Sequence, residues 1–139
     1  MTEQELIAEI RSWCGTPWMH MQAVKGVGAD CIQLVVAVAK RAGWMPADFK
    51  TVKYSMDYAL HNTDSVLIRE LARYTGQIPF RDMSVGDVLV FKFGKCGSHA
   101  GICIGPGRMV HSHIRHGVIE SDIAPMRPRL LSVWRFPRG

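Results

Sequence analysis

The chain has 139 residues, of which 47% are hydrophobic and 21% are charged. These proportions are typical of a folded domain and exclude an intrinsically disordered chain. The length fits one domain over residues 1–139, with a core large enough to need no disulfide bond or metal for its stability. No uncharged apolar run reaches the roughly 18 residues of a membrane-spanning helix, so we expect no membrane insertion.

Basic residues outnumber acidic ones, which gives a formal net charge of +5 and a pI near 9.3. Such a charge suits anionic partners, for example nucleic acid, a lipid surface or a cell-wall polymer. The Lys and Arg residues are scattered, however, except in the segment RPRLLSVWRFPRG at residues 127–139. Scattered charge does not form the basic stripe of a nucleic-acid-binding protein, so we expect no nucleic-acid partner.

The first ten residues, MTEQELIAEI, contain acidic residues where a secretion signal has basic residues followed by an apolar segment. We therefore expect no signal peptide, synthesis in the cytoplasm and delivery to any outer compartment by another route. Four cysteines are present, namely Cys14, Cys31, Cys96 and Cys103. Their spacing is not that of a disulfide framework, so we expect them to be reduced.

Two amphipathic helices are predicted at residues 2–13 and 63–76. In the first, Thr2 and Glu5 have the spacing of a capping box. The second begins at a Thr-Asp pair and stops at a glycine, which are typical start and stop signals.

A third helix lies between these two and is the most apolar. Asp30 is a good N-cap for it, Cys31 falls in its first turn, and Gly43 stands at the position of a C-terminal stop. The residues between Cys31 and Gly43 are apolar on nearly every face, so we expect a helix buried at the centre of the domain.

The second half of the chain has the pattern of short strands. The segments are rich in β-branched residues and are separated by Gly or Pro, as in an antiparallel meander. They are VLVFKF (88–93), HAGICIG (99–105), RMVHSH (108–113), GVIE (117–120) and LLSVWRF (130–136). Helices first and strands afterwards predict an α+β fold, with the N-terminal helices packed on a C-terminal antiparallel sheet.

Cys31 lies at the start of the central helix, where chemistry and packing give different expectations. The unpaired N–H groups and the positive end of the helix dipole stabilise a thiolate, so we expect a lowered pKa for this thiol. The same N–H groups can hold the oxyanion that forms when a thiolate attacks a carbonyl. Free cysteine is also among the most frequently buried residues, so packing alone explains many such positions.

A nucleophilic cysteine requires a base, and the hairpin formed by the second and third strands carries three histidines. If residues 105–107 form a three-residue loop, Gly101 lies opposite His111, and His99 lies opposite His113. All three imidazoles then share one face of the hairpin. Either His111 or His113 is placed to hold His99 in the orientation and tautomer of a general base.

Three blocks occur in the order GADCIQLV, GDVLVF and HAGICIGPGRMVHS. Together they resemble the NlpC-type papain-like cysteine peptidases of bacterial cell walls. This resemblance implies a papain-like fold in which Cys31 is the nucleophile, His99 the general base and His111 the orienting residue. The stretch GTPWMHMQAVKGVGADC at residues 15–31 is similar to the branch of this family encoded among phage and prophage tail genes.

The sequence departs from the family pattern near the nucleophile. Ile32 and Gln33 stand where Ser-Gly usually follows the cysteine, and Trp18 stands where a tyrosine is common. The substrate groove is therefore expected to differ in shape. As candidate substrate-binding residues we name four: Trp18, His20, Asp30 and His113.

The resemblance implies hydrolysis of an amide bond in the peptide stems of peptidoglycan, typically the bond from D-glutamate to the diamino acid. This chemistry needs no metal and no organic cofactor. The implied partners are the stem peptides and phage tail proteins, and the implied route to the wall is a phage tail or cell lysis.

Three other interpretations compete with this one. A zinc site could be built from Cys96, His99, Cys103 and His111, although no paired Cys-x-x-Cys motif supports it. A structural tail component could keep the fold and bind the wall without turnover. A thiol amidase or acyltransferase could use the same residues on another substrate, because a fold does not define the acyl group.

Overall fold

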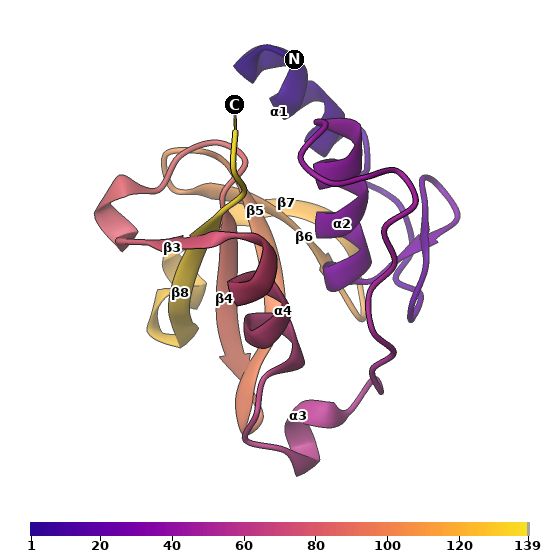
Figure 1. Ribbon diagram of the computed structural model, residues 1–139, viewed down its shortest axis with the longest axis vertical. Coiled ribbons are helices and arrows are strands. Elements are labelled where there is room, and N and C mark those ends of the chain that lie inside the picture. Colours follow the sequence, from indigo (N-terminus) through magenta and orange to yellow (C-terminus); the bar gives the residue numbers. More distant parts are fainter. Residues whose placement is uncertain (139) are drawn as a thin grey trace.

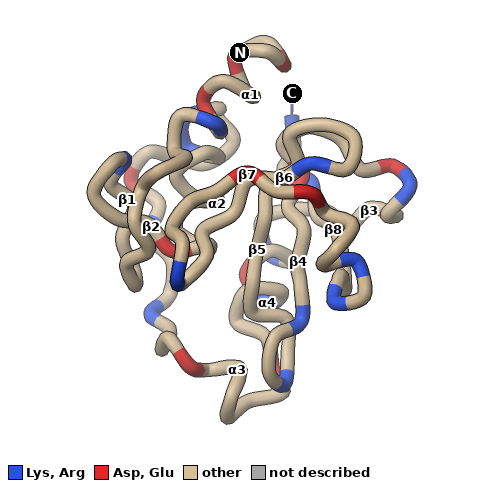
Figure 2. The backbone as a smooth tube through the Cα atoms, turned by 180° about the vertical axis from the view of Figure 1, so that it is seen from behind, with Lys and Arg blue, Asp and Glu red and all other residues tan. Residues whose placement is uncertain are grey.

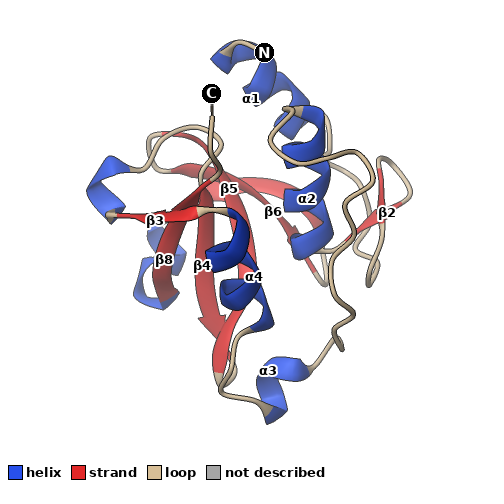
Figure 3. Cartoon of the chain, viewed as in Figure 1, coloured by secondary structure: helices blue, strands red, loops and turns tan. Residues whose placement is uncertain are grey.

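A six-stranded antiparallel sheet takes up the second half of the chain, and the helices pack against one of its faces (Figures 1 and 3). The computed structural model describes residues 1–138. The helices are α1 (Glu3–Arg11), α2 (Cys31–Arg41), α3 (Tyr58–His61) and α4 (Val66–Tyr74), with 3-10 turns η1 (Phe80–Asp82) and η2 (Ala124–Arg129). The strands are β1 (Ala23–Val24), β2 (Gly28–Ala29), β3 (Gly76–Ile78), β4 (Val88–Phe93), β5 (Cys96–Gly105), β6 (Arg108–His113), β7 (Gly117–Asp122) and β8 (Leu130–Arg135). The predicted α+β fold is confirmed.

The strand order of the large sheet is β3-β8-β4-β5-β6-β7. Strands β4 to β7 follow one another as hairpins, as the meander prediction requires. The prediction is wrong for β8, which returns across the sheet and pairs with β4 instead of following β7. The free edge of β4 accepts it because hairpin formation leaves that edge unpaired, and the buried Val133 and Trp134 of β8 then join the core.

Helix α1 begins with the predicted capping box. The Glu5 backbone N–H donates to Oγ1 of Thr2 at 3.1 Å, and the Thr2 N–H donates to the Glu5 carboxylate at 2.9 Å. Leu6 and Ile10 are the buried residues of this helix. They join the core between the helices and the sheet.

Helix α2 begins and ends at the predicted residues. The Asp30 carboxylate accepts the Gln33 backbone N–H at 2.7 Å, and Gly43 has a φ of +81°, a left-handed conformation that ends the helix. By contrast, α4 begins one or two residues later than predicted, because Ser65 rather than Thr63 or Asp64 supplies the cap by accepting the Ile68 N–H. It ends at Tyr74, before the predicted stop at Gly76, which is the first residue of β3.

The sheet has two buried faces, and the alternation along the hairpins assigns residues to them. Ile102 and Val110 face the core that contains α1, α2 and α4. Cys103 and Met109 pack on the opposite face, with Ile123 just before η2. His99 and His111 share the numerical parity of this second set, so the hairpin carries both histidines away from the face that packs on the helices.

The outer edge of the sheet at β7 contacts the segment that follows α1. The Gly15 N–H donates to the Val118 carbonyl at 2.9 Å, and the Val118 N–H donates to the Thr16 carbonyl at 2.8 Å. Gly117 has a φ of +73°, and a Cβ there would lie 2.5 Å from the Thr16 carbonyl oxygen. Glycine is therefore required where these two segments approach each other.

Basic residues are distributed over the whole molecule (Figure 2). The arginines of the basic C-terminal segment have two different environments. Arg135 and Arg138 pair with the buried Asp87, at 2.8 and 3.2 Å, and so stabilise the fold. Arg127 and Arg129 are exposed on η2.

Candidate active site

A cleft of about 280 Å³ opens at the N-terminal end of α2. It is lined by residues from the start of α2, from β5 and β6, and from the segments before and after α2. Six of the seven candidate residues line it, namely Trp18, His20, Asp30, Cys31, His99 and His113. The seventh, His111, is buried and in contact with His99.

Cys31 is positioned by the first turn of α2, and its side chain points toward β5. Its thiol lies 3.7 Å from the carbonyl oxygen of Ser98, to which it donates. The backbone N–H of Ala100 also faces the sulfur. Because Ser98 and Ala100 flank His99, the thiol lies against the part of β5 that carries this imidazole.

His99 and His111 form the central contact of the site. Nε2 of His99 lies 2.7 Å from Nδ1 of His111, and the two rings are nearly perpendicular at 81°. The other ring nitrogen of His111, Nε2, lies 2.7 Å from Oγ of Ser121. With Nε2 occupied by His111, Nδ1 is the ring nitrogen of His99 that is left to act as a base.

The hairpin register explains why His111, and not His113, contacts His99. Gly101 pairs with His111 as predicted, but the pairing of β5 with β6 does not extend to His99 and His113, so the prediction that these two lie opposite each other is wrong. The ring of His113 is stacked on that of His116 at 4.8 Å. Its Nδ1 accepts the Arg115 backbone N–H at 3.0 Å, so this nitrogen has a local partner.

The expectation of a lowered pKa at Cys31 is wrong. Burial, followed by the negative charge of Asp30, raises the pKa of the Cys31 thiol to about 12. The N–H groups of Cys31, Ile32 and Ala100 act in the opposite direction and lower it, but they contribute less. The helix terminus thus lowers the pKa of the thiol, as predicted. Desolvation outweighs this effect because the residue is only 9% exposed.

Burial also lowers the pKa of His99, to about 3, and the neighbouring His111 adds to this effect. The pKa of His111 is lowered to about 4 by burial and, less, by His113. At neutral pH the site therefore holds a neutral thiol beside two neutral imidazoles.

Asp30 links the start of α2 to the segments on either side of it. Its carboxylate accepts the Gln33 N–H at 2.7 Å, the Met21 N–H at 2.8 Å and the Tyr54 hydroxyl at 2.6 Å. Gln33 in turn donates to the hydroxyls of Thr51 at 2.8 Å and of Tyr54 at 3.2 Å. Tyr54 thereby places beside the nucleophile a hydroxyl that Trp18 lacks.

The aromatic residues of the cleft form a continuous wall. The ring of His20 stacks with that of Trp18 at a centroid distance of 6.5 Å and meets the ring of Tyr54 edge-on at 5.4 Å. Phe93 also lines the cleft, and its ring lies edge-on to that of His99 at 5.6 Å.

Sequence reasoning missed Phe93 and Ser121. Ser121 had a detectable signal, because one more residue on the predicted strand 117–120 would have placed it diagonal to His111.

The four residues of the zinc interpretation are not brought together. Cys96 packs with Tyr58 and Ala59, whereas Cys103 packs on the other face of the sheet with Leu89. Within residues 1–138, no group of three or more His, Cys, Asp or Glu side chains is arranged to hold a metal ion.

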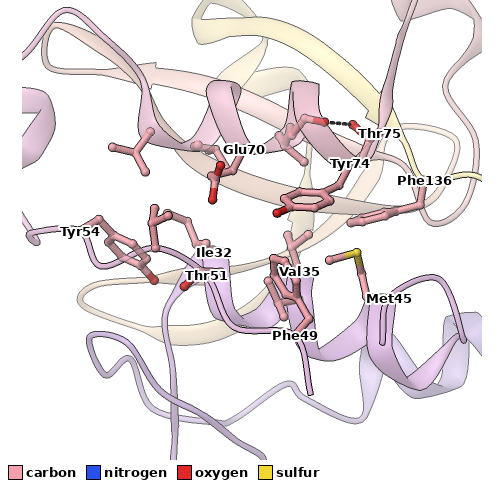
Figure 4. A pocket seen from close by; sticks show the side chains of 15 residues that line it. Ile32, Val35, Met45, Phe49, Thr51, Tyr54, Glu70, Tyr74, Thr75 and Phe136 are labelled. Carbon is pink, nitrogen blue, oxygen red and sulfur yellow. Dashed lines mark hydrogen bonds between the residues drawn. The ribbon is translucent and has the colours of Figure 1, made fainter. Parts of the chain in front are cut away.

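A second pocket lies between α2, α4 and the segment that joins α2 to α3 (Figure 4). Its walls are mainly apolar, with Val35, Phe49 and Phe136 among the lining residues and Glu70 as the charged one. Its free volume of about 50 Å³ is close to that of one or two water molecules. Tyr54 separates it from the cleft and lines both.

Residues 13–135 match the family model described as the NlpC/P60 family. This match covers most of the chain, and the protein therefore belongs to the NlpC/P60 family. A comparison with curated proteins found no match.

Solved structures of this family share the fold. The NlpC/p60 domain of the peptidoglycan hydrolase SagA superimposes with a TM-score of 0.65 and 14% identity, covering 97% of this chain and 99% of that one. NlpC2 from Trichomonas vaginalis gives a TM-score of 0.72 and 15% identity, covering 99% of this chain and 47% of that one. A Staphylococcus aureus NLP/P60 family protein, described as similar to lipoprotein, gives 0.68 and 18%, covering 99% and 42%. These similarities confirm the papain-like fold, and the chain spans less than half the length of the last two proteins.

Among the helices within residues 1–138, none combines the length and the apolar character needed to cross a membrane.

Proposed function

We propose that the protein is a cysteine peptidase that hydrolyses an amide bond in the peptide stems of peptidoglycan, with Cys31 as nucleophile, His99 as general base and His111 as the residue that orients His99. The observation that carries this proposal is the bond of 2.7 Å between His99 and His111, beside a thiol that contacts both residues flanking His99. Membership of the NlpC/P60 family supports it.

The arrangement of the site suits acyl transfer from a resting state in which the Cys31 thiol and the His99 imidazole are both neutral. As the sulfur of Cys31 attacks the carbonyl carbon, its proton passes to Nδ1 of His99. The N–H groups at the start of α2 stabilise the oxyanion of the tetrahedral intermediate. His99 then gives the proton to the leaving amine, and water hydrolyses the resulting thioester with His99 again as the base. The proton taken from water passes from His99 to the departing sulfur of Cys31, which restores the thiol and closes the cycle.

The proposal also states which amide bond of the stem is cleaved and with which partners the protein acts. The resemblance to NlpC-type peptidases supports cleavage between D-glutamate and the diamino acid. The stretch at residues 15–31 supports action with a phage or prophage tail, so tail proteins are the proposed partners and the tail or lysis the proposed route to the wall. The four residues Trp18, His20, Asp30 and His113 are proposed to contact the stem, as part of the cleft wall.

The first experiment is the release of new free amines from purified peptidoglycan and from defined stem peptides. We expect release by the unmodified protein and none by Cys31→Ala or Cys31→Ser, because neither variant has a thiol to acylate. Cys14→Ala is the matched control, since Cys14 is exposed and lies outside the cleft. The masses of the products identify the bond.

Because Cys31 is buried, circular dichroism must show that both variants fold. Binding of stem peptides without amine release by the folded protein would overturn the enzymatic proposal and favour a structural, wall-binding protein. Release from non-wall amides alone would instead favour an amidase or acyltransferase with another substrate.

A further inference from the structure

The series of hydrogen-bonded side chains that begins at His99 does not end at His111. Nε2 of His111 lies 2.7 Å from Oγ of Ser121, on the neighbouring strand β7. In the part of the chain that the structure describes, this hydroxyl is the hydrogen-bond partner of Nε2, while Nδ1 of His111 is occupied by His99. Ser121 has no part in the family motifs on which the proposed function rests.

The role of His99 as a base determines which atom donates and which accepts in the hydrogen bonds from His99 through His111 to Ser121. To accept a proton from Cys31, Nδ1 of His99 must carry none, so the proton of the neutral ring is on Nε2. Nε2–H then donates to Nδ1 of His111, which must be an acceptor. The proton of neutral His111 is therefore on its own Nε2, and that N–H donates to the oxygen of Ser121.

The opposite direction gives a site that cannot work as a base. If Nδ1 of His111 carried the proton, it would donate to Nε2 of His99, and the proton of His99 would be on Nδ1, which could then not accept a proton from the thiol. Two neutral tautomers of His111 thus correspond to two states of His99, one competent as a base and one not. Both rings are neutral at pH 7, because burial lowers the pKa values of His99 and His111 to about 3 and about 4.

We propose that Ser121 is a positioning residue of this site: its hydroxyl oxygen accepts the Nε2–H of His111 and so satisfies the buried N–H of the tautomer that leaves Nδ1 of His99 free to take the proton of Cys31. Without this oxygen, the Nε2–H of that tautomer has no acceptor, and the other tautomer of His111 is favoured. The same direction serves the imidazolium form of His99, because its Nε2–H continues to donate to His111. Hydrogen bonds in such a chain polarise one another, so an acceptor at its end also favours the charged intermediate.

The inference rests on the proposed function, but its test has a readout that needs no turnover. In ¹⁵N NMR spectra, the shifts of the ring nitrogens report which nitrogen of each histidine is protonated. In the unmodified protein near pH 7 we expect protonated Nε2 on both His99 and His111. In Ser121→Ala we expect His111 to populate the Nδ1–H tautomer, and Ser121→Thr, which keeps the oxygen, to restore the original spectrum.

The kinetic expectation follows from the same argument. For Ser121→Ala we expect kcat to fall about 10-fold with little change in KM, and Ser121→Thr to recover most of the loss, because the residue acts on the base and not on substrate binding. Ser132→Ala is the matched control. It removes a serine of the same sheet whose hydroxyl accepts the Trp134 indole N–H at 2.8 Å, so it costs a hydrogen bond without touching the histidines.

An unchanged His111 tautomer in Ser121→Ala overturns the inference, as does a kcat equal to that of the unmodified protein. A loss of kcat in Ser132→Ala as large as that in Ser121→Ala would also overturn it, because the effect would then be general destabilisation. If the unmodified protein releases no amine, the proposed function fails, and the NMR comparison still decides whether Ser121 sets the tautomer.

Discussion

His111 contacts His99 through one ring nitrogen and Ser121 through the other, and this double contact distinguishes it from the other histidines near the cleft. For His111→Ala we expect kcat to fall about 10- to 100-fold, because His99 loses the group that holds its ring. For His99→Ala we expect a fall larger by at least about 10-fold, since the base itself is removed. The measurement is kcat on a defined stem peptide.

His113→Ala serves as the comparison, because this residue also faces the cleft but bonds to Arg115 and stacks on His116. Its effect on kcat should be the smallest of the three. A larger loss of kcat in His113→Ala than in His111→Ala would show that the chain of side chains described above is not the one used in the reaction.

Local patterns in the sequence were sufficient to find the start of α2 at Cys31 and the hairpin that carries His99 and His111, because helix caps and hairpin registers depend on residues close in the chain. The choice of His111 over His113, and the grouping of both histidines with Cys31, came from the resemblance to the NlpC-type peptidases. The ionisation of Cys31 was not predictable in this way. The groups that bury it come from β5 and from the segment after α2, and their effect exceeds that of the helix terminus. The role of Ser121 was missed because the predicted strand ended one residue before it.

At the scale of elements, the start of α2 is tied to the segment at residues 51–56 by the hydroxyl of Tyr54. Tyr54→Phe removes the bonds of this hydroxyl to Asp30 and Gln33, and we expect the free energy of unfolding to fall by about 1–2 kcal/mol. Urea unfolding monitored by circular dichroism measures this change. We also expect KM to rise, because Tyr54 lines the cleft.

Tyr74→Phe is the matched control, since Tyr74 lines the second pocket and its hydroxyl makes no hydrogen bond to any residue in the range 1–138. Equal losses of stability in the two variants would show that the hydroxyl network around Asp30 contributes nothing specific.

The elements themselves were predictable to different degrees. The capping signals at Thr2 and Asp30 and the hairpin signal at residues 105–107 are local, and the corresponding elements were found. The predicted three-residue loop was wrong, because Gly105 belongs to β5 and pairs with Arg108 after a register shift. The place of β8 was not, because its pairing with β4 joins residues some forty positions apart and no local pattern encodes such a partner. Strands β1 and β2 have two residues each, too few for an alternation to be seen.

At the scale of the whole molecule, the buried histidine pair makes stability depend on pH. The pKa values of His99 and His111 in the folded protein, about 3 and about 4, lie below the ordinary value of about 6.5 for the unfolded chain. Between these limits the unfolded chain binds more protons than the folded protein, so the free energy of unfolding falls as pH falls from 6.5 toward 4. Urea unfolding at several pH values across this range measures the slope.

The variant His99→Gln/His111→Gln should have a shallower slope over the same range, because two of the groups that take up protons on unfolding are gone. His61→Gln, which changes an exposed histidine on α3, should keep the original slope. A double variant whose slope equals that of the unmodified protein would contradict the assignment of this pH dependence to the buried pair.

The contact between residues 15–16 and Val118 has a consequence for how the molecule behaves in a crowded solution. An open sheet edge offers unpaired N–H and C=O groups onto which another chain can add a strand. At β7 the N–H and C=O of Val118 are already used by Thr16 and Gly15, so the protein's own N-terminal segment covers the start of this edge. The opposite edge is β3, only three residues long, which is too short to template a stable intermolecular sheet. The fold therefore shortens the stretch of open strand at both ends of its sheet, at β7 because Val118 is already paired and at the other end because β3 is short.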